Sequence, residues 1–243
     1  MNDPVMMESN APIGPVAFPS GSPPERLYRF HINGVDLEIP RGMLAPDIWE
    51  ALCLGTYEAE ELAGLMGIIR PEDVVLELGA GLGFISTFIA RALRPARITT
   101  VEADPLVAAL ARRTHALNRV DVAVKEGLVA PEVGTVSFHR QPSFWASSVA
   151  WLPESTSVDL PALAFRDLLA EVRPSVLVLD VEGAECGLFE GVDLAGVRSI
   201  SLELHRRLTG LAGIRDLFLT LGARGFAYEP TWSKGPVVVF NRV

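Results

Sequence analysis

From about residue 71 onward, short apolar runs alternate with stretches whose apolar residues repeat every three or four positions. The runs predict strands and the repeats predict helices. We expect strands at 74–80, 97–104, 120–127, 135–139, 175–181, 197–205, 226–230 and 235–243. We expect helices at 84–93, 105–118, 160–172, 186–190 and 213–225. Strands that are apolar on both faces and alternate with helices predict an α/β fold, with a mostly parallel sheet covered on both sides.

The first 70 residues follow a different pattern and predict two further segments. Residues 1–25 are rich in Pro, Ser, Gly and Asn, which favours a flexible N-terminal arm. Residues 26–70 should form a hairpin and a helical cover. The hairpin turns at Asn33-Gly34, because a type I′ turn needs positive φ at both central residues. The helical part, 46–69, should break near Gly55. Residues 71–243 then form the main domain.

Composition narrows the classes of function. The chain of 243 residues is 49% hydrophobic and carries a formal net charge of −9. A charge of this sign disfavours broad electrostatic binding to nucleic acid or to anionic membranes. Two isolated cysteines, Cys53 and Cys186, are too few for a disulfide framework or a zinc motif. The N-terminus does not resemble a signal peptide, and no apolar run of about 20 residues predicts a membrane span, so we expect a cytoplasmic protein.

A glycine-rich turn follows the first strand of the main domain. Gly79, Gly81 and Gly83 lie in "LELGAGLGFIS". Glycines at such a turn allow backbone N–H groups to approach a ligand. The spacing fails the G-x-G-x-x-G pattern of dinucleotide folds, because Phe84 and Ile85 follow. An NAD-dependent dehydrogenase is therefore a poor fit.

Two glutamates near this turn indicate the ligand. Glu77 comes two positions before the first glycine, where a carboxylate suits a cationic ligand such as S-adenosylmethionine better than a pyrophosphate. Glu102 ends the second strand, about 20 residues later, where an acid can accept hydrogen bonds from ribose hydroxyls. The adenine should then lie near residues 125–128, at the end of the third strand.

Acidic residues and a histidine follow the fourth and fifth strands. Asp180 ends "SVLVLD", and Glu203 and His205 end "VRSISLELH", so the three side chains should converge. They could hold a divalent ion, with Mn²⁺ or Fe²⁺ suiting an imidazole better than Mg²⁺. Without metal, His205 could act as general base, oriented by a carboxylate. We expect Glu185 to begin the next helix, and the role of Glu182 stays open.

The ordered motifs of the chain resemble one methyltransferase family. Tyr57-Glu58, "LELGAGLGFIS", "VEADP", "LDVEGAE" and "ISLELH" together look like the FkbM-type S-adenosylmethionine-dependent methyltransferases. The resemblance implies a Rossmann-like class I methyltransferase fold with a seven-stranded, mostly parallel sheet and an N-terminal extension. It also implies methyl transfer, commonly to a hydroxyl oxygen of a small natural product or sugar. Glu77 replaces the family's usual Asp, and the chain lacks its Lys before Asp180.

The residues and the resemblance together yield a set of expected site residues. Catalysis is expected from Asp180, Glu203 and His205, which are also the candidate metal ligands. Cofactor binding is expected from Tyr57, Glu77, Gly79, Ala80, Gly81, Gly83, Phe84, Glu102, Ala103 and Asp180. The hairpin and the helical segment should cover the cofactor.

The acceptor is expected to be a small hydroxyl compound. Methylation of nitrogen or of a macromolecule, and a non-catalytic adenosylmethionine-binding scaffold, remain alternatives. Residues 141–151, rich in aromatic and hydroxyl side chains, could form a lid or substrate wall. The oligomeric state stays open, a homo-oligomer included.

Overall fold

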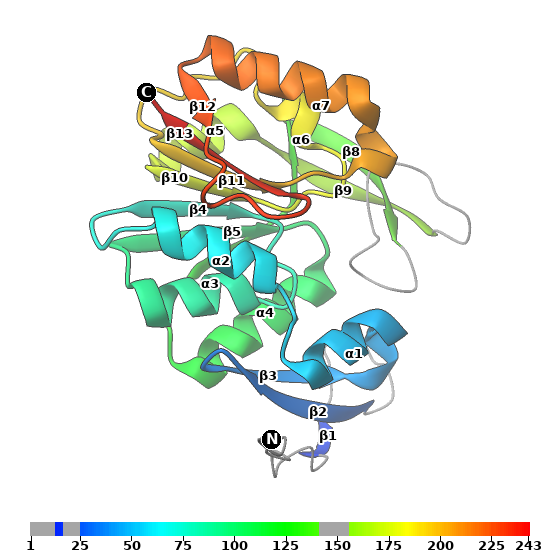
Figure 1. Cartoon of the computed structure of the whole chain (residues 1–243). Helices are drawn as coiled ribbons and strands as arrows, with labels where there is room; N and C mark the ends of the chain where they lie inside the picture. The colour runs from blue at the N-terminus through cyan, green and yellow to red at the C-terminus, as the bar shows by residue number, and fades with distance from the viewer. Residues whose placement is uncertain (1–12, 17–24, 141–155) are drawn as a thin grey trace.

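The computed structural model describes residues 13–16, 25–140 and 156–243. Its main domain is built on a seven-stranded sheet (Figure 1). All neighbouring strands are parallel except at β13, which runs antiparallel to both of its neighbours. In spatial order the strands are β12 (Phe226–Tyr228), β13 (Val237–Arg242), β11 (Ser199–Glu203), β10 (Val176–Leu179), β4 (Val74–Leu78), β5 (Arg97–Glu102) and β6 (Ala123–Glu126). The predicted α/β fold is confirmed.

Helices cover both faces of this sheet (Figure 1). One layer contains α2 (Ala59–Ile68), α3 (Phe84–Phe88) with its π-helical continuation (Ile89–Leu93), and α4 (Pro105–Asn118). The other contains α5 (Phe165–Val172), α6 (Glu185–Leu188) and α7 (Arg206–Ala223). Alternate strand residues enter the two cores: Val176 and Val178 pack in one cluster, and Leu177 and Leu179 in the other. The double-sided burial explains the continuous apolar runs of the strands.

A smaller sheet corrects the sequence prediction for residues 156–164. β9 (Thr156–Ala164) lies between β7 (Leu128–Ala130) and β8 (Gly134–Arg140). We predicted helix from residue 160, whereas α5 begins only at Phe165. Leu160, Ala162 and Ala164 are buried in alternation, which is the period of a strand. Their individual preference for helix concealed that period.

The N-terminal hairpin is confirmed, but its position differs from the prediction. β2 (Glu25–Ile32) and β3 (Val35–Pro40) pair around Asn33 and Gly34, which both have positive φ. Within the predicted arm, β1 (Ile13–Val16) pairs with β2, and residues 1–12 and 17–24 lie outside the described residues. β3 packs on α3 and α4, on the side of these helices away from the sheet (Figure 1).

Two short helical segments connect the hairpin to the main domain. A 3₁₀ turn (Arg41–Met43) precedes α1 (Pro46–Leu54), and α2 follows after Gly55. The predicted break is confirmed, since Gly55 ends α1 with a φ of 71°. No helix in the described ranges is long and apolar enough to cross a membrane.

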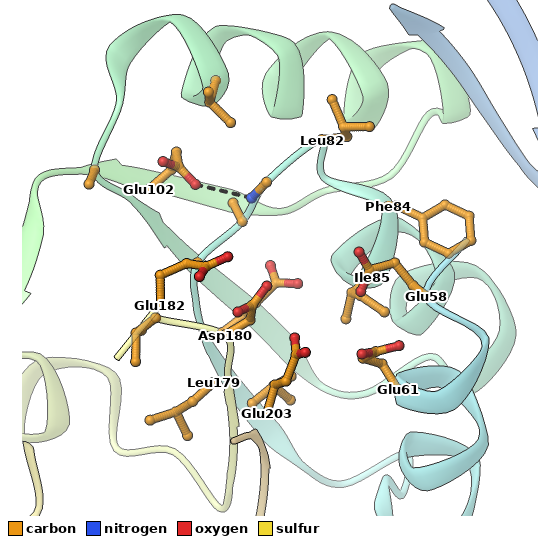
Figure 2. Close-up of a pocket in the computed structure, with 18 of the residues that line it drawn as sticks. Glu58, Glu61, Leu82, Phe84, Ile85, Glu102, Leu179, Asp180, Glu182 and Glu203 are labelled. Atoms are coloured by element: carbon orange, nitrogen blue, oxygen red, sulfur yellow. Dashed lines mark hydrogen bonds between the residues drawn. The ribbon is translucent and has the colours of Figure 1, made fainter. Parts of the chain in front are cut away.

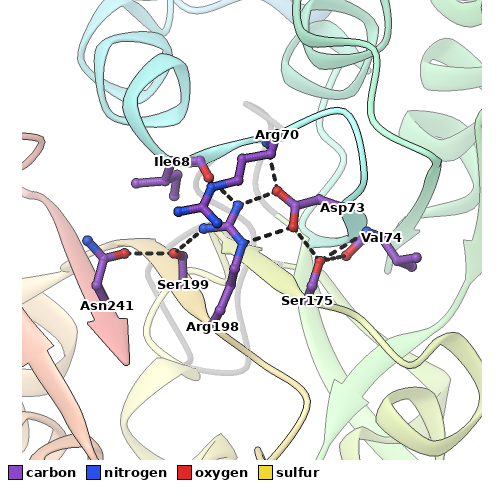
Figure 3. A network of polar contacts seen from close by, with 8 residues as sticks. All are labelled: Ile68, Arg70, Asp73, Val74, Ser175, Arg198, Ser199 and Asn241. Carbon is purple, nitrogen blue, oxygen red and sulfur yellow. Dashed lines mark hydrogen bonds and ion pairs between the residues drawn. The ribbon is translucent and has the colours of Figure 1, made fainter. Parts of the chain in front are cut away.

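A buried ion pair ties the strands together at the edge of the sheet where the parallel strands begin (Figure 3). Asp73, just before β4, is 1% exposed and makes an ion pair with Arg198, just before β11. Arg198 Nε donates to Asp73 Oδ1 at 2.9 Å, and the Ser175 hydroxyl donates to the same oxygen at 2.6 Å. The Arg198 guanidinium also donates to the carbonyl of Ile68. This network anchors the start of three neighbouring strands and leaves the opposite edge free for the site.

Candidate active site

A cavity of about 650 Å³ opens at the carboxyl ends of β4, β5, β10 and β11. This is the edge at which open parallel sheets bind ligands. Its floor contains Gly79, Gly81, Glu102 and Asp180, and α1 and α2 supply another wall. None of the described hairpin residues 25–40 lines it, so the prediction that the hairpin covers the cofactor is not supported; the helical part of the cover does line the cavity.

The glycine turn is shaped by close packing as well as by the need for an open surface. Gly79 has a φ of 88°, and a Cβ there would lie 1.8 Å from the carbonyl oxygen of Asp180. Gly83 has a φ of 71°, and a Cβ there would lie 2.8 Å from the Cα of Ala111 on α4. Gly81 has nothing within 4 Å. Gly79 and Gly83 therefore allow close approach of neighbouring elements, and Gly81 keeps the surface of the pocket open.

Glu102 connects the glycine turn to the start of α4. Its Oε2 accepts a hydrogen bond from the Gly81 N–H at 3.0 Å (Figure 2), and its Oε1 accepts one from the Asp104 N–H at 2.9 Å. Burial raises the pKa of Glu102 to about 7, although these N–H groups lower it. Each carboxylate oxygen accepts more than one hydrogen bond. The structure thus leaves acceptor sites for the predicted ribose contact, beside Ala103 in the pocket wall.

Glu77 lies at the base of the pocket, next to the first glycine. It is 2% exposed, and neither carboxylate oxygen accepts a hydrogen bond of standard geometry. Burial raises its pKa to about 7, although Thr100 and Ser86 lower it. A buried carboxylate without a full set of donors is costly unless a ligand supplies one. Glu77 lines the pocket, and its contact with a cationic group stays a prediction.

The remaining predicted cofactor residues lie near the same floor. Ala80, Tyr57 and Phe84 line the pocket, and the two aromatic rings pack edge to face at 5.3 Å between centroids. For the adenine, Gly127 and Leu128 line the pocket, whereas the Lys125 ammonium pairs with Glu171 at 2.7 Å. Residues 141–151, the predicted lid, lie outside the described residues.

Four carboxylates surround the imidazole of His205. Its Nε2 lies 3.4 Å from Asp180 Oδ1, 3.3 Å from Glu182 Oε2 and 3.9 Å from Glu203 Oε2. On the other side of the ring, Nδ1 lies 3.5 Å from Glu185 Oε1. The predicted convergence of Asp180, Glu203 and His205 is present, and Glu182 joins it. Glu182 follows β10 with a φ of 46°, an uncommon backbone conformation for a non-glycine residue.

Glu185 combines the predicted place at the start of α6 with a second role. It is fully buried, and its oxygens accept hydrogen bonds from the N–H groups of Gly183 at 2.9 Å and His205 at 3.1 Å. Although burial raises the pKa of Glu185, the His205 side chain, and then backbone N–H groups that include that of His205, lower it below its usual value. Glu185 therefore fixes the backbone and the ring of His205, which the sequence did not reveal.

The charges of the cluster decide which groups can accept a proton. Burial alone would lower the pKa of His205, but Glu185, Glu182 and Asp180 outweigh it and raise the pKa to about 9. Burial and mutual repulsion raise the pKa of Asp180, that of Glu182 to about 8 and that of Glu203 to about 7. An imidazolium has no lone pair for a proton, so the raised pKa of His205 favours the carboxylates over His205 as the proton acceptor.

Two further carboxylates reach the pocket from α2. Glu58 and Glu61 point from this segment toward the side occupied by Asp180 and Glu203 (Figure 2). Burial raises the pKa of both, and repulsion from Asp180 adds to the shift. Glu58 has a φ of 55°, again rare without glycine. Glu61 was not predicted from the sequence, because acids in the first turn of a helix are common. Glu58 was noted only as part of the family motif.

Solved structures with a similar chain path include several methyltransferases, at low identity. TYW2 from M. jannaschii in complex with AdoMet is 13% identical with a TM-score of 0.49, covering 91% of this chain and 89% of that one. A methyltransferase from Pyrococcus furiosus is 13% identical with a TM-score of 0.48, over 86% and 89%. A putative O-methyltransferase from Klebsiella pneumoniae is 15% identical with a TM-score of 0.46, over 86% and 84%. These values are too low to bear on the chemistry of this chain.

Comparison of the sequence with protein-family models identifies the family of this chain, which the low-identity structural matches do not. No curated protein matches the sequence significantly. The model of the methyltransferase FkbM domain matches residues 77–228, more than half of the 243 residues. The matched range contains the glycine turn, Glu102 and the whole cluster around His205. The chain therefore belongs to the FkbM-type methyltransferases, which use S-adenosylmethionine as the methyl donor.

Proposed function

We propose that the enzyme methylates a hydroxyl oxygen of a small molecule, of the natural-product or sugar class. The observation that carries this proposal is the group of carboxylates that lines the pocket, which we call the acidic wall. Asp180, Glu182 and Glu203 lie together on one side, with Glu58 and Glu61 opposite. Hydroxyl groups donate hydrogen bonds to carboxylates, and a hydroxyl nucleophile also needs a group that removes its proton.

The same wall disfavours amines as acceptors. Carboxylates close to an amine stabilise its protonated form, because an opposite charge favours the charged state. An ammonium has no lone pair with which to attack the methyl group. Nitrogen methylation would therefore have to proceed against the charge of Asp180, Glu203 and Glu61, whereas a neutral hydroxyl gains a proton acceptor from the same groups.

The reaction is a displacement at the methyl carbon of the sulfonium. The acceptor oxygen forms a bond to the methyl carbon while the carbon–sulfur bond breaks, and its electrons stay on sulfur, which leaves S-adenosylhomocysteine. The hydroxyl proton passes to a carboxylate of the wall. Holding the oxygen in line with the methyl group contributes about 7–11 kcal/mol in well-oriented systems. A positioned base adds about 10²–10⁴-fold.

The size and charge of the site support a small acceptor. A cavity of about 650 Å³ is within the range of small-molecule sites, about 300–1,000 Å³, and must hold donor and acceptor together. The net charge of −9 opposes a nucleic-acid substrate. Glu58 and Glu61, which lie before the matched family range of 77–228, would contact the acceptor and make the α2 segment a determinant of specificity.

The proposal is tested with ¹³C-methyl-labelled S-adenosylmethionine and paired acceptors that differ only in carrying a hydroxyl or an amine. Carbon NMR separates O-methyl from N-methyl products, and we expect O-methyl products alone. Products methylated only on nitrogen would refute the proposal. S-adenosylhomocysteine binding without turnover of any acceptor would instead favour the non-catalytic scaffold.

A pair of variants tests the role of the acidic wall. Asp180→Asn should lower the methyl-transfer rate by about 10²-fold or more, because it removes a proton acceptor beside the donor. Its affinity for S-adenosylhomocysteine should stay within a few-fold of wild type in a calorimetric titration. The exposed Asp193, whose Oδ1 accepts from the Ala195 N–H, supplies the control Asp193→Asn, which should leave both quantities unchanged.

A further inference from the structure

Three side chains from two neighbouring strand ends place their ligand atoms around one point. Asp180 follows β10, and Glu203 and His205 end and follow β11, its parallel neighbour. One oxygen or nitrogen of each residue lies within 4.8 Å of the others. His205 Nε2 is 3.4 Å from Asp180 Oδ1 and 3.9 Å from Glu203 Oε2. Ligands bound at about 2.1 Å lie roughly 3.0–3.5 Å apart around a common cation, so the spacing is close to that of a coordination shell.

The imidazole is held in the orientation that metal-binding histidines adopt. Such a histidine presents one ring nitrogen to the metal and its other to a carboxylate, which fixes the ring and its tautomer. Here the fully buried Glu185 faces Nδ1 at 3.5 Å and is itself held by two backbone N–H groups. Nε2 is thereby directed to the side of the ring where Asp180 and Glu203 lie.

One carboxylate oxygen at this point lacks a hydrogen-bond partner. Asp180 Oδ1 is inaccessible to solvent and has no hydrogen-bond partner. In the described ranges, His205 is the sole basic residue that forms an ion pair with Asp180, Glu182 or Glu203. One imidazole cannot neutralise three carboxylates. A buried oxygen without a partner is unfavourable unless a ligand occupies the space beside it.

We infer that Asp180, Glu203 and His205 bind one divalent transition-metal cation, of the Mn²⁺ or Fe²⁺ class, at the acceptor end of the pocket. The imidazole ligand favours these ions over Mg²⁺, which prefers oxygen. Glu182 Oε2, 3.3 Å from His205 Nε2, is available as a fourth ligand. The role of the ion rests on the proposed function, in which it would lower the pKa of the acceptor hydroxyl. Binding of the ion does not rest on that function.

The experiment is a titration of the full chain with Mn²⁺ alone, followed by electron paramagnetic resonance. We expect one bound Mn²⁺ per chain. Electron spin echo modulation of the complex should show the ¹⁴N coupling of a coordinated imidazole, and His205→Gln should remove it. Glu203→Gln should weaken Mn²⁺ binding by more than about 100-fold. Glu185→Gln, which changes the group behind the ring, should weaken it by about 10–100-fold.

Matched variants separate coordination from general attraction of cations to an acidic pocket. Glu61→Gln removes a carboxylate that faces the pocket but lies outside the three-residue group, and should change Mn²⁺ affinity by only a few-fold. His31→Gln removes an exposed histidine that lies 2.8 Å from Asp36, and should change nothing. Equal losses in Glu61→Gln and Glu203→Gln would overturn the inference.

The wild-type protein alone can also overturn it, whatever the variants do to folding. Failure of the wild type to bind Mn²⁺, or a bound Mn²⁺ without nitrogen coupling, refutes coordination by His205. A parallel titration with S-adenosylhomocysteine distinguishes this outcome from failure of the proposed function. Donor binding and O-methyl transfer without Mn²⁺ would leave the proposed function intact and remove the metal. Circular dichroism of each variant confirms that its fold is retained.

Discussion

At the scale of single residues, the glycine turn shows two different uses of the same amino acid. Gly79 lets β4 and the residue after β10 meet, because the Asp180 carbonyl occupies the space of a side chain. Gly81 borders open space and donates its N–H to Glu102. Both have positive φ, so both carry a strain cost with any other residue. Only at Gly79 is there a steric clash as well.

This difference predicts unequal effects of two alanine substitutions. Gly81→Ala should cost about 1–3 kcal/mol of unfolding free energy from backbone strain alone. Gly79→Ala should cost more, because a Cβ at 1.8 Å from the Asp180 carbonyl forces the two strand ends apart. It should also weaken S-adenosylhomocysteine binding, since the glycine turn that lines the pocket moves. Urea unfolding and calorimetry measure the two quantities. Equal losses of stability would show that the clash is relieved without cost.

The functional residues differ in how far they could be predicted from the sequence. Asp180, Glu203 and His205 could be placed together, because carboxyl ends of neighbouring parallel strands meet at one edge. Glu58 and Glu61 could not, because the position of α2 against the strand ends depends on tertiary packing. Glu185 was assigned to a helix start, and its contact with His205 follows from a tight turn, through Gly183, that no residue pattern specifies.

At the scale of elements, α4 carries a buried titratable group. His115 is 4% exposed, and its Nε2 lies 3.0 Å from the Ser86 hydroxyl on α3. Burial, with a smaller contribution from Arg112, lowers its pKa from 6.5 to about 4. The folded state thus binds the proton less readily than the unfolded chain. This group therefore lowers stability as the pH falls below 6.5 toward 4.

The prediction concerns the slope of stability against pH. In the wild type, His115 contributes up to about 1.4 kcal/mol of lost stability per pH unit between pH 6.5 and 5. His115→Gln should remove this contribution, so that the difference in unfolding free energy between variant and wild type narrows at lower pH. Urea unfolding at several pH values measures it. His31→Gln, at an exposed position on the hairpin, is the control; a constant difference for His115→Gln would contradict the prediction.

The ion pair at the opposite edge of the sheet is a second feature of this scale. Although burial raises the pKa of Asp73, hydrogen bonds from Arg198, Ser175 and the Arg70 N–H lower it below its usual range. Arg198→Met leaves this carboxylate buried and unpaired. Such a loss costs about 3–5 kcal/mol, whereas an exposed pair contributes about 0–1 kcal/mol. Arg215→Met, which breaks an exposed pair with Asp216, is the matched control in urea unfolding. Equal small losses would show that the network adds little.

The elements themselves were predictable where one signal dominated. Residues 74–80 and 175–181 read as strands because burial on both faces makes most of their positions apolar. Residues 160–164 read as helix because Leu and Ala prefer it, and β9 forms there because β7 and β8 offer partners on both sides. Such pairing between segments far apart in the chain overrides local preference.

At the scale of the whole molecule, the N-terminal segment serves two purposes. Its hairpin packs on α3 and α4, where the amide of Asn118 donates to the backbone carbonyl of Asp36 at 2.7 Å. Its helical part reaches the pocket and adds Glu58 and Glu61 to a site built from the main domain. The sequence predicted this extension but placed the hairpin over the cofactor, because a hairpin signal carries no information about the surface on which it packs.

The carboxylates added by the α2 segment are expected to lower the stability of the fold while contributing to methyl transfer. The pKa of Glu58 lies well above 4.5, through burial first and then repulsion from Glu61 and Asp180. A carboxyl group whose pKa is higher in the folded state than in the unfolded chain stabilises the fold at a pH below its unfolded pKa. This contribution is lost as the pH rises through the folded-state pKa. Glu58→Gln should therefore raise the thermal midpoint at pH 8, but not at pH 4, while lowering methyl transfer. Each 1 kcal/mol corresponds to about 2–4 °C for a chain of this size.

The control for the Glu58→Gln variant is Glu50→Gln, which removes one negative charge at an exposed position on α1. It separates the local environment of Glu58 from a general effect of net charge, which is −9 for the chain. Scanning calorimetry at pH 4 and pH 8 measures both variants. If Glu58→Gln lowered the midpoint at pH 8, the carboxylate would have to be stabilised by partners inside the fold. The carboxylates of the acidic wall would then serve to stabilise the fold. Carboxylates that serve ligand binding are instead expected to lack compensating partners when no ligand is bound.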